Sequence, residues 1–502
     1  MGYQKLRKGA ALLGALLFIG SLLAGCGSDQ DELYSQALGR DDLSAEEVDP
    51  SENDGLEGSL TISTEHLYEG TGVQAMAELF MEQNPGVSIT LNEGLTDQEM
   101  TDTSGNALAN YASELATSIM SGEGPDIVAD LGLMSPRKYG ESGLFLDLYE
   151  LMEADPEFHK EDYFTNILDA FSYEGKLFNL PATFAFNMVV MNETIAQALD
   201  VDTDALSGVN YQDAAEWFSQ AREQGLLPED ATVFYEDASG ARCFEDYEIS
   251  AHYGNSLDTM TLGSSDFVQY LETTKEVFPP APSSGLLYMT SGGTAQDFLE
   301  EQNALFFRVN TSIAGVQELL EKQEGCSKPL FMQASTGDTV FGVGSNVYSI
   351  TSSCKDPELA WEFLKFCVEE VEQPGYYDVF QEAGAIDIVR GAIPINKANF
   401  RKYAEVYARV EAAQNAWYAD AENVGQFDVT QLNLDEVDQQ LREEDFQVVE
   451  TYIQEMDIPT DREVGLALVT EELLSQYYTT DTMSAQECAQ KLQERAEIYY
   501  RE

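Results

Sequence analysis

The sequence predicts an α/β fold, and two observations lead to it. Short apolar stretches with alternating polar residues, typical of strands, recur along the chain. Between them lie longer stretches whose apolar residues fall three and four positions apart, as in helices that pack on a sheet. This alternation predicts parallel strand pairing with helices covering the sheets. A chain of 502 residues with 43% hydrophobic residues is long enough to form two or three cores.

The expected elements follow in order and are separated by turn-forming residues. Strands or extended segments are expected over residues 59–64, 87–91, 126–130, 177–181, 184–190, 304–309 and 340–350. Helices are expected over residues 73–83, 111–120, 211–224 and 358–371. Asn84-Pro85-Gly86 is a typical helix stop. The remainder of the chain, after residue 400, is predicted to be mostly helical and acidic.

The first residues have the layout of a signal peptide. Basic Lys5, Arg7 and Lys8 precede an apolar run over residues 9–23, which is too short to span a bilayer as a helix. The run ends in Leu-Ala-Gly-Cys26, which resembles the bacterial lipobox. The resemblance implies that residues 1–25 are a lipoprotein signal peptide and that Cys26 carries the lipid. An ordinary secretion signal with an incidental cysteine is the alternative.

The segment that follows, residues 26–58, contains many acidic and few large apolar residues, so we expect a lipid-anchored acidic linker. The expected location is the extracellular face of the cytoplasmic membrane, at the cell surface or in the periplasm.

Charge and cysteine content exclude several functions. The chain has 90 acidic and 26 basic residues, a formal net charge of −64, which argues against nucleic acid or anionic lipid as the main partner. Five cysteines remain after Cys26, an odd number without C-x-x-C spacing, so we expect small buried hydrophobic residues.

No motif predicts catalysis, a cofactor or a metal. Asp200, Asp202 and Asp204 alternate as in a calcium loop, but the glycine and glutamate that an EF-hand needs are missing. The three histidines are too widely spaced for a zinc motif, and the chain has neither a phosphate-binding G-x-x-x-x-G-K nor a nucleophile G-x-S-x-G. We therefore do not expect an enzyme. A surface glycosidase stays as a remote alternative, because carboxylate pairs are uninformative in so acidic a chain.

Several segments together resemble one family. They include Ser121-Gly-Glu-Gly-Pro-Asp-Ile-Val, Gly175-Lys-Leu-Phe-Asn-Leu-Pro, Phe298-Leu-Glu-Glu-Gln-Asn-Ala-Leu-Phe-Phe and Pro357-Glu-Leu-Ala-Trp-Glu-Phe-Leu-Lys-Phe. Each is weak alone, but their order and spacing over residues 59–400 resemble the extracellular solute-binding proteins of ATP-binding-cassette (ABC) importers. The resemblance is to family 1, the carbohydrate-type group that includes maltose-binding protein.

The resemblance implies a two-lobe periplasmic-binding-protein-like fold with a ligand cleft between the lobes. Lobe 1 would comprise residues 59–182 plus 342–390, and lobe 2 residues 186–339 plus 395–502. Hinge segments would cross between the lobes around residues 180–186, 337–342 and 384–394. Such a protein would capture a sugar or oligosaccharide and deliver it to ABC permease subunits in the membrane. A surface protein for another solute (peptide, polyamine or metal) or a ligand sensor is the alternative.

Candidate ligand contacts follow from the same resemblance, because strand ends face the cleft in such sheets. Sugars need polar groups for their hydroxyls and aromatic faces for their C–H surfaces. The candidates are His66, Tyr68, Asp130, Phe184, Phe186, Arg308, Asn310, Asn346, Trp417 and Tyr418. Core packing is the alternative for the two phenylalanines, and pairing with an acidic side chain is the alternative for Arg308. Asp126 is expected to be a structural turn residue.

Overall fold

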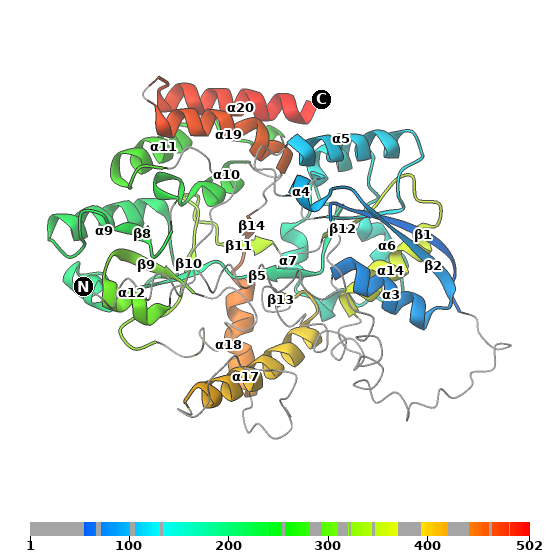
Figure 1. Ribbon diagram of the computed structural model, residues 1–502, viewed down its shortest axis with the longest axis horizontal. Helices are drawn as coiled ribbons and strands as arrows, with labels where there is room; N and C mark the ends of the chain where they lie inside the picture. The colour runs from blue at the N-terminus through cyan, green and yellow to red at the C-terminus, as the bar shows by residue number, and fades with distance from the viewer. Residues whose placement is uncertain are drawn as a thin grey trace. The chain divides into compact units, whose positions relative to one another are not determined.

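The computed structural model divides the chain into residues 1–55 and residues 56–502, and the residues it describes belong to the second unit apart from Gly55. The described residues are 55–66, 72–100, 106–130, 134–237, 239–253, 257–281, 294–309, 320, 323–343, 347–369, 393–419, 441–460, 464–480 and 482–501. Their strands form three sheets (Figure 1).

The first sheet has five strands and is parallel at one side only. Its order is β2 (Gly86–Glu93), β1 (Glu57–Thr64), β3 (Ile127–Asp130), β12 (Val347–Ile350) and β4 (Leu180–Pro181). Strand β1 pairs in parallel with β2 and β3, whereas β12 runs antiparallel to both β3 and β4. The carboxyl ends of β1, β2 and β3 therefore lie at one edge.

The second sheet also has five strands. Its order is β7 (Gly208–Val209), β10 (Leu330–Met332), β6 (Met188–Met191), β9 (Ala304–Arg308) and β8 (Thr232–Phe234). Strand β6 runs antiparallel to β10 and β9, while β7 is parallel to β10 and β8 is parallel to β9. Four carboxyl ends consequently share one edge with the amino end of β6.

A third sheet, with four strands, is built from the segments that connect the first two. Its order is β13 (Ile393–Pro394), β5 (Thr183–Ala185), β11 (Val340–Val343) and β14 (Ile458–Pro459). One continuous stretch supplies β4 to the first sheet, β5 to the third and β6 to the second. A second stretch supplies β10, β11 and β12 to the same three sheets in the reverse order, and β5 pairs antiparallel with β11. The two connections therefore lie side by side.

Helices surround these sheets (Figure 1). Those that follow strands of the first sheet or its connections are α3 (Gly72–Gln83), α4 (Asp97–Met100), α5 (Asn106–Met120), α6 (Leu148–Ala154), α7 (Thr165–Ala170) and α14 (Pro357–Glu369), with short turns η1 (Pro136–Gly140) and η2 (Lys160–Asp162). Those associated with the second sheet are α8 (Glu193–Ala198), α9 (Tyr211–Glu223), α10 (Glu245–Tyr253), α11 (Ser265–Val277) and α12 (Ala295–Glu301), with η3 (Gly240–Arg242) and η4 (Leu257–Thr259).

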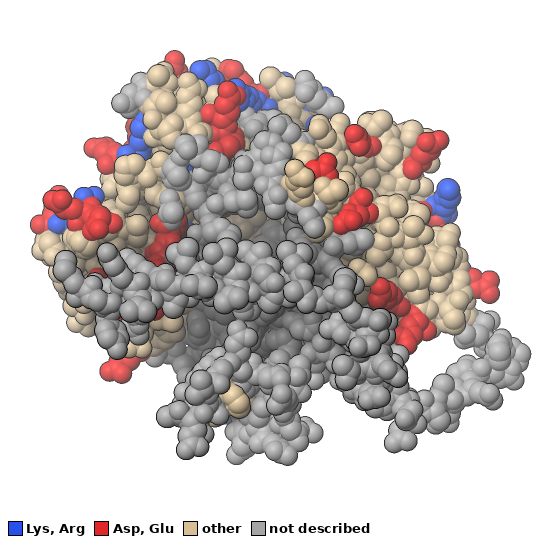
Figure 2. All heavy atoms as spheres, viewed as in Figure 1, with Lys and Arg blue, Asp and Glu red and all other residues tan. Residues whose placement is uncertain are grey.

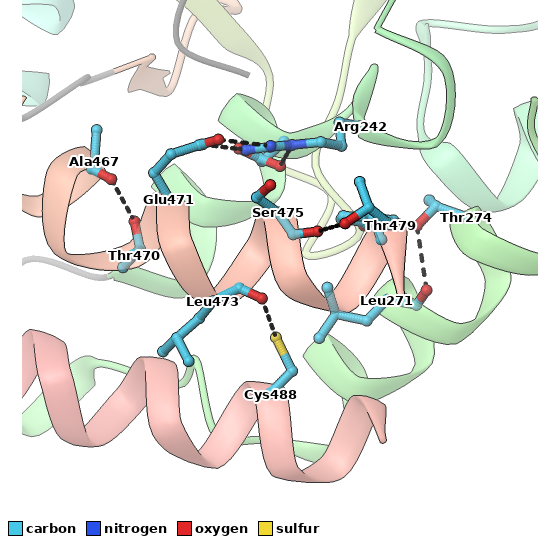
Figure 3. Close-up of polar contacts among 12 residues, drawn as sticks. Arg242, Leu271, Thr274, Ala467, Thr470, Glu471, Leu473, Ser475, Thr479 and Cys488 are labelled. Atoms are coloured by element: carbon cyan, nitrogen blue, oxygen red, sulfur yellow. Dashed lines mark hydrogen bonds and ion pairs between the residues drawn. The ribbon is translucent and has the colours of Figure 1, made fainter. Parts of the chain in front are cut away.

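Four further helices complete the described chain: α17 (Lys397–Ala419), α18 (Glu443–Gln454), α19 (Val464–Thr479) and α20 (Ala485–Arg501). Helices α19 and α20 pack side by side, and α20 also packs on α11. Figure 3 shows how side chains of this region connect, with Arg242 of η3 reaching Glu471 of α19 and the Cys488 thiol directed at the Leu473 carbonyl. The C-terminal helical pair is thus part of the core beside α11.

Aromatic contacts fix the helices on the first sheet. The Phe80 ring of α3 lies edge-on to Phe363 and Phe366 of α14, with ring centroids 5.4 and 5.0 Å apart. Trp361 is buried, and its indole N–H donates to Asp155. Because such pairs contribute beyond the area they bury, α3 and α14 form a rigid layer behind β1 and β12.

The predicted elements are largely confirmed, with two corrections. The parallel pairing expected from the alternation holds for β1 with β2 and β3, for β7 with β10 and for β8 with β9. Strand β12 is antiparallel to β3 and β4, and β6 is antiparallel to β10 and β9, because these strands belong to the connections between the sheets. The helix expected over residues 111–120 begins at Asn106. Asp126 is structural, since its carboxylate accepts hydrogen bonds from the Thr61 backbone and hydroxyl and from the Lys355 backbone.

The cysteines are mostly buried, as the sequence predicts. All five described cysteines are free thiols, and Cys243, Cys326, Cys367 and Cys488 are buried as expected. Cys354 differs in being half-buried. Burial raises the pKa of Cys326 to about 11 and that of Cys488 to about 12, so both stay protonated at neutral pH.

Candidate functional site

At the first sheet, polar residues gather where β1, β2 and β3 end. Glu65 and His66 follow β1 directly, and the chain after β2 returns to them, because the Leu95 N–H donates to the Glu65 carbonyl. Ligands in α/β sheets bind outside the carboxyl ends of the strands. We call the residues at this edge, Glu65, His66 and Glu93, the first strand-end group.

His66 is held in one orientation by acceptors on β2 and beyond it. Its Nδ1 lies 2.7 Å from Glu93 Oε1 and 3.3 Å from the Leu95 carbonyl oxygen. Two acceptors at one ring nitrogen favour the proton on Nδ1. The His66 side chain is only 11% exposed, so the ring is a fixed polar group and not a freely rotating one.

A glycine lets the chain after β2 pass close to helix α5, beside His66. A Cβ on Gly94 would lie 2.1 Å from the Tyr111 ring, so only glycine lets the chain pass here. The Tyr111 hydroxyl in turn lies 2.9 Å from the Ser63 hydroxyl, near the end of β1. Helix α5 and strand β1 therefore fix the shape of the first strand-end group together.

At the second sheet, an arginine network lies where β8 and β9 end. Arg308 is the last residue of β9, and its Nη2 lies 3.1 Å from Asp237 Oδ2, which follows β8. Its Nη1 donates to the Tyr247 hydroxyl of α10, and the guanidinium carbon lies 4.1 Å from the centroid of the Phe234 ring. We call Arg308, Asp237 and Tyr247 the second strand-end group.

Asp237 is fixed as firmly as Arg308. Its other carboxylate oxygen accepts hydrogen bonds from the backbone N–H and the hydroxyl of Ser239. Asp237 and Tyr247 are buried, whereas the Arg308 side chain is 30% exposed. The Arg308 side chain is thus partly accessible, whereas both groups that it contacts are buried.

Electrostatics keep the Arg308 guanidinium charged. Burial opposes the charge of Arg308, but Tyr247 and Asp237 outweigh that effect and raise the pKa of the guanidinium. Burial raises the pKa of Tyr247 as well, although Arg308 works against it, so the phenol stays protonated at neutral pH. The result is a charged pair of Arg308 and Asp237 beside a neutral phenol.

A further buried acid lies near the same edge. Glu248 of α10 is 0% exposed and accepts hydrogen bonds from the Ser335 N–H at 2.8 Å and from its hydroxyl. Ser335 lies between β10 and β11, so Glu248 ties α10 to the connection that enters the third sheet. His252, one turn later, has its Nε2 3.6 Å from the same carboxylate.

The sequence-predicted residues fall into distinct places. His66 and Arg308 belong to the two strand-end groups, and Asp130 is the last residue of β3, where its backbone pairs with Val347. Phe184 and Phe186 are each 0% exposed and lie in the hydrophobic core, Phe184 against Phe164. Both are packing residues in this structure, and neither ring offers a face to a solute.

Of the other predicted ligand contacts, Trp417 is the one whose side chain the structure describes. Trp417 lies near the end of α17 and is 37% exposed. Tyr68, Asn310, Asn346, the Tyr418 side chain and Cys26, which the sequence also predicts as functional, lie outside what the structure describes.

Sequence reasoning missed Asp237, Tyr247 and Glu248. A signal for Asp237 was present, because the short strand Thr232–Phe234 is followed, after one tyrosine, by two acidic residues. Tyr247 and Glu248 lie on a helix whose faces show no clear amphipathic pattern in the sequence, so nothing marked them.

The described residues contain neither a metal-binding cluster nor a membrane-spanning helix. No group of three or more His, Cys, Asp or Glu side chains among them is arranged to hold a metal ion. Within the same residues, no helix is both long and apolar enough to cross a membrane.

Comparisons with known proteins bear on the family and fold. The family model described as bacterial extracellular solute-binding protein matches residues 64–374. The solved structure of the sugar-binding protein MalE from Xanthomonas citri is similar, with 10% identity, a TM-score of 0.51, and coverage of 88% of this chain and 98% of that one. The ABC substrate-binding protein Lmo0181 from Listeria monocytogenes, in complex with cycloalternan, has 16% identity, a TM-score of 0.49, and coverage of 88% and 99%. No match was found among curated proteins.

The likeness to the Xanthomonas protein concerns the fold, and the family model covers most of the two five-stranded sheets. The chain therefore belongs to the bacterial extracellular solute-binding proteins.

Proposed function

We propose that this protein is a lipid-anchored, extracellular solute-binding protein that captures a sugar or oligosaccharide and delivers it to the permease subunits of an ABC importer. The proposal places the solute between the carboxyl ends of the two five-stranded sheets, in contact with both strand-end groups. A solute that touches both stabilises the closed arrangement, which a membrane partner can recognise.

The observation that carries the proposal is the third sheet. Its strands β5 and β11 come from the two connections between the larger sheets and pair with each other. Short paired connections of this kind can act as a hinge, which is what a protein that closes on its solute needs. The similar Xanthomonas protein is a sugar-binding protein, and for that reason the proposal names carbohydrate.

The proposed contacts are those that follow from the strand ends. His66 and Arg308 would offer fixed hydrogen-bonding groups to sugar hydroxyls, and Asp130, Tyr68, Asn310, Asn346, Trp417 and Tyr418 remain proposed contacts. For Phe184 and Phe186 the proposal is limited to packing, because both rings are buried. No catalytic step is proposed, since Arg308 lies in an ion pair with Asp237 and His66 lies against Glu93.

Calorimetry with a panel of oligosaccharides tests the proposal. We expect at least one to bind, and we expect Arg308→Gln to weaken that binding about tenfold or more, the loss of one charge-assisted hydrogen bond. Arg495→Gln, which removes an exposed guanidinium from α20, is the matched control and should bind as the unaltered protein does. A folded protein that ignores every sugar but binds a peptide or polyamine would contradict the carbohydrate assignment.

The anchor needs a separate experiment. We expect the full-length chain to incorporate a labelled fatty acid in bacteria and to partition with membranes, because Leu-Ala-Gly-Cys26 resembles a lipobox. Cys26→Ser should abolish both, whereas Cys354→Ser should change neither. Release of a soluble, unlabelled protein from the unaltered chain would favour an ordinary secretion signal.

A further inference from the structure

We infer that the solute bound at this site is uncharged or positively charged, and that the site rejects acidic sugars such as uronates. The inference rests on the proposed function and concerns the same two strand-end groups. Three observations carry it: the state of Arg308, the charges beside His66 and the charge of the whole chain.

Arg308 is neutralised within the protein. Its guanidinium forms an ion pair with Asp237 at 3.1 Å, and Asp237 is held in place by Ser239 and is almost fully buried. A carboxylate or phosphate on the solute would have to compete with Asp237 for the same cation and would lie close to its negative charge. Two like charges a few ångströms apart repel strongly in a partly desolvated site.

The same Arg308 is well suited to an uncharged solute. A guanidinium has five N–H groups, of which the Nη1 and Nη2 contacts with Tyr247 and Asp237 use only two. The side chain is 30% exposed, whereas its Nε is buried. The remaining hydrogens of Nη1 and Nη2 are therefore the ones that would donate to sugar hydroxyls without any change in the ion pair. Fixed donors that belong to a neutral ion pair favour neutral polar ligands.

The first strand-end group adds negative charge at the other sheet. Glu65 is 5% exposed at the end of β1, and Glu93 pairs with His66 at 2.7 Å. His66 is thus already paired with Glu93, whose carboxylate an anionic solute would approach. An anionic solute would therefore meet a further unfavourable field here, whereas an amino sugar would gain from it.

The chain as a whole acts in the same direction. Its formal net charge of −64 repels anions and attracts cations over the distance that salt leaves unscreened. Figure 2 shows acidic side chains spread across the described part of one face. Long-range steering and local pairing both oppose a negatively charged solute.

Matched oligosaccharides of one length test the inference by calorimetry. The probes are neutral maltotriose, cellotriose and chitotriose, acidic trigalacturonate, and basic triglucosamine. We expect the tightest neutral or basic probe to bind at least about tenfold more tightly than trigalacturonate. Trigalacturonate binding as tightly as the best other probe would overturn the inference and leave the carbohydrate function standing. No binding by any probe would overturn the proposed function and this inference with it.

Two variants separate the local field from the global one. Asp237→Asn keeps the shape of the side chain but removes the charge that neutralises Arg308. The ratio of the affinity for the best neutral or basic probe to the affinity for trigalacturonate should therefore shrink about tenfold. Glu93→Gln should lower the same affinity ratio. Because the Glu93 side chain is 41% exposed, this variant should fold even if Asp237→Asn does not. Glu472→Gln makes the same change of charge at an exposed arginine pair on α19. Equal effects of all three variants would overturn the role of the strand-end groups.

Discussion

Arg242 brings a positive charge into the hydrophobic region between η3, α11 and α19. Its side chain is 0% exposed, and its guanidinium donates to Glu471 at 3.0 Å and to Glu245 at 2.6 Å (Figure 3). Both glutamates are largely buried. A buried ion pair is not necessarily stabilising compared with apolar packing, but removing one partner leaves the others unpaired and desolvated.

We therefore predict that Arg242→Met destabilises the protein by about 3–5 kcal/mol, the usual cost of breaking a buried ion pair. Denaturant unfolding of the purified protein measures it. Arg495→Met is the matched control, because Arg495 and its partner Glu472 are 39% and 80% exposed and such pairs contribute at most about 1 kcal/mol. Similar losses for both variants would mean that Arg242 does not hold α19 in place.

Asp155, at the end of α6, provides a pH-dependent contribution to stability. Burial opposes its ionisation, but hydrogen bonds from Lys365, the Glu157 backbone and Trp361 outweigh this and lower the pKa of Asp155 to about 2. An aspartate in an unfolded chain has a pKa of about 4. The stabilisation is therefore complete above pH 4 and is lost as the pH falls towards 2.

Asp155→Asn should accordingly cost about 1 kcal/mol at pH 6, a value reduced for solvent screening, and the difference from the unaltered protein should vanish between about pH 4 and pH 2. Unfolding free energies across that pH range provide the measurement. Asp230→Asn, at an exposed position, should show no such trend. A cost that stays constant down to pH 2 would exclude the ionised carboxylate as its source.

At this scale the sequence identified single residues but not their partners. Position after a strand was enough to select His66 and Arg308. The partner of Arg308 lies 71 positions earlier in the chain, and Tyr247 lies on yet another element. Local patterns contain no information on such pairings, so pairing of Arg308 with an acidic side chain was an open alternative, and the acid, Asp237, could not be named. Likewise, an extended pattern cannot tell that both Phe184 and Phe186 point into the core.

Among the elements, the turn before β11 has a strict conformational requirement. Gly337 has a φ of +91°, and its N–H donates to the Ala334 carbonyl while the Ala334 N–H donates to Asp338. No atom lies near the position of a Cβ, so space is not limiting. The requirement for glycine comes from the backbone conformation, because residues with a Cβ rarely adopt it.

Gly337→Ala should therefore destabilise the protein by about 1–2 kcal/mol, from backbone strain alone. Thermal unfolding measures the change. Gly263→Ala is the control, because that glycine has no positive φ and a Cβ there makes only an ordinary contact with Gln493. Should the two alanines prove equally harmless, the turn would not constrain how the chain enters β11.

Element prediction succeeded where a pattern is local, whereas the change of sheet over residues 180–186 was expected only from the family resemblance. Helices α3, α9 and α14 lie within two residues of their expected bounds, since each has one apolar face. The extended segments over residues 177–190 were expected to be consecutive strands, but β4, β5 and β6 belong to three sheets. Sheet membership depends on distant pairing, which side-chain alternation does not encode.

Over the whole molecule, acidity is the dominant physical property. With a formal net charge of −64, the folded chain brings together charges that the unfolded chain holds further apart. Raising the ionic strength from about 0.01 to 0.1 M shortens the screening length from roughly 30 to 10 Å.

We predict that this change in salt raises the unfolding temperature by a few degrees, which differential scanning calorimetry can record. Near pH 4 many carboxylates are protonated and the repulsion is weaker, so the gain should be smaller there. An unfolding temperature that is independent of salt at pH 7 would show that the charges are already balanced by their local surroundings.

Fold class and family could be predicted from the sequence because the motifs recur in order over most of the chain. The three expected crossings correspond in part to β5, β11 and β13, but β14 was not foreseen, since Ile458-Pro459 has no strand pattern of its own. It becomes a strand only because Val340 pairs with it.

The position of β12 between β3 and β4 determines when the first sheet can be completed as the chain leaves the ribosome. Strand β3 ends at Asp130, yet its neighbour β12 ends only at Ile350. Until that residue has emerged, one edge of β3 has no partner, and pairings this distant in sequence form slowly. The first sheet of the nascent chain therefore stays incomplete until residue 350 has emerged, when about two thirds of the chain has already been synthesised.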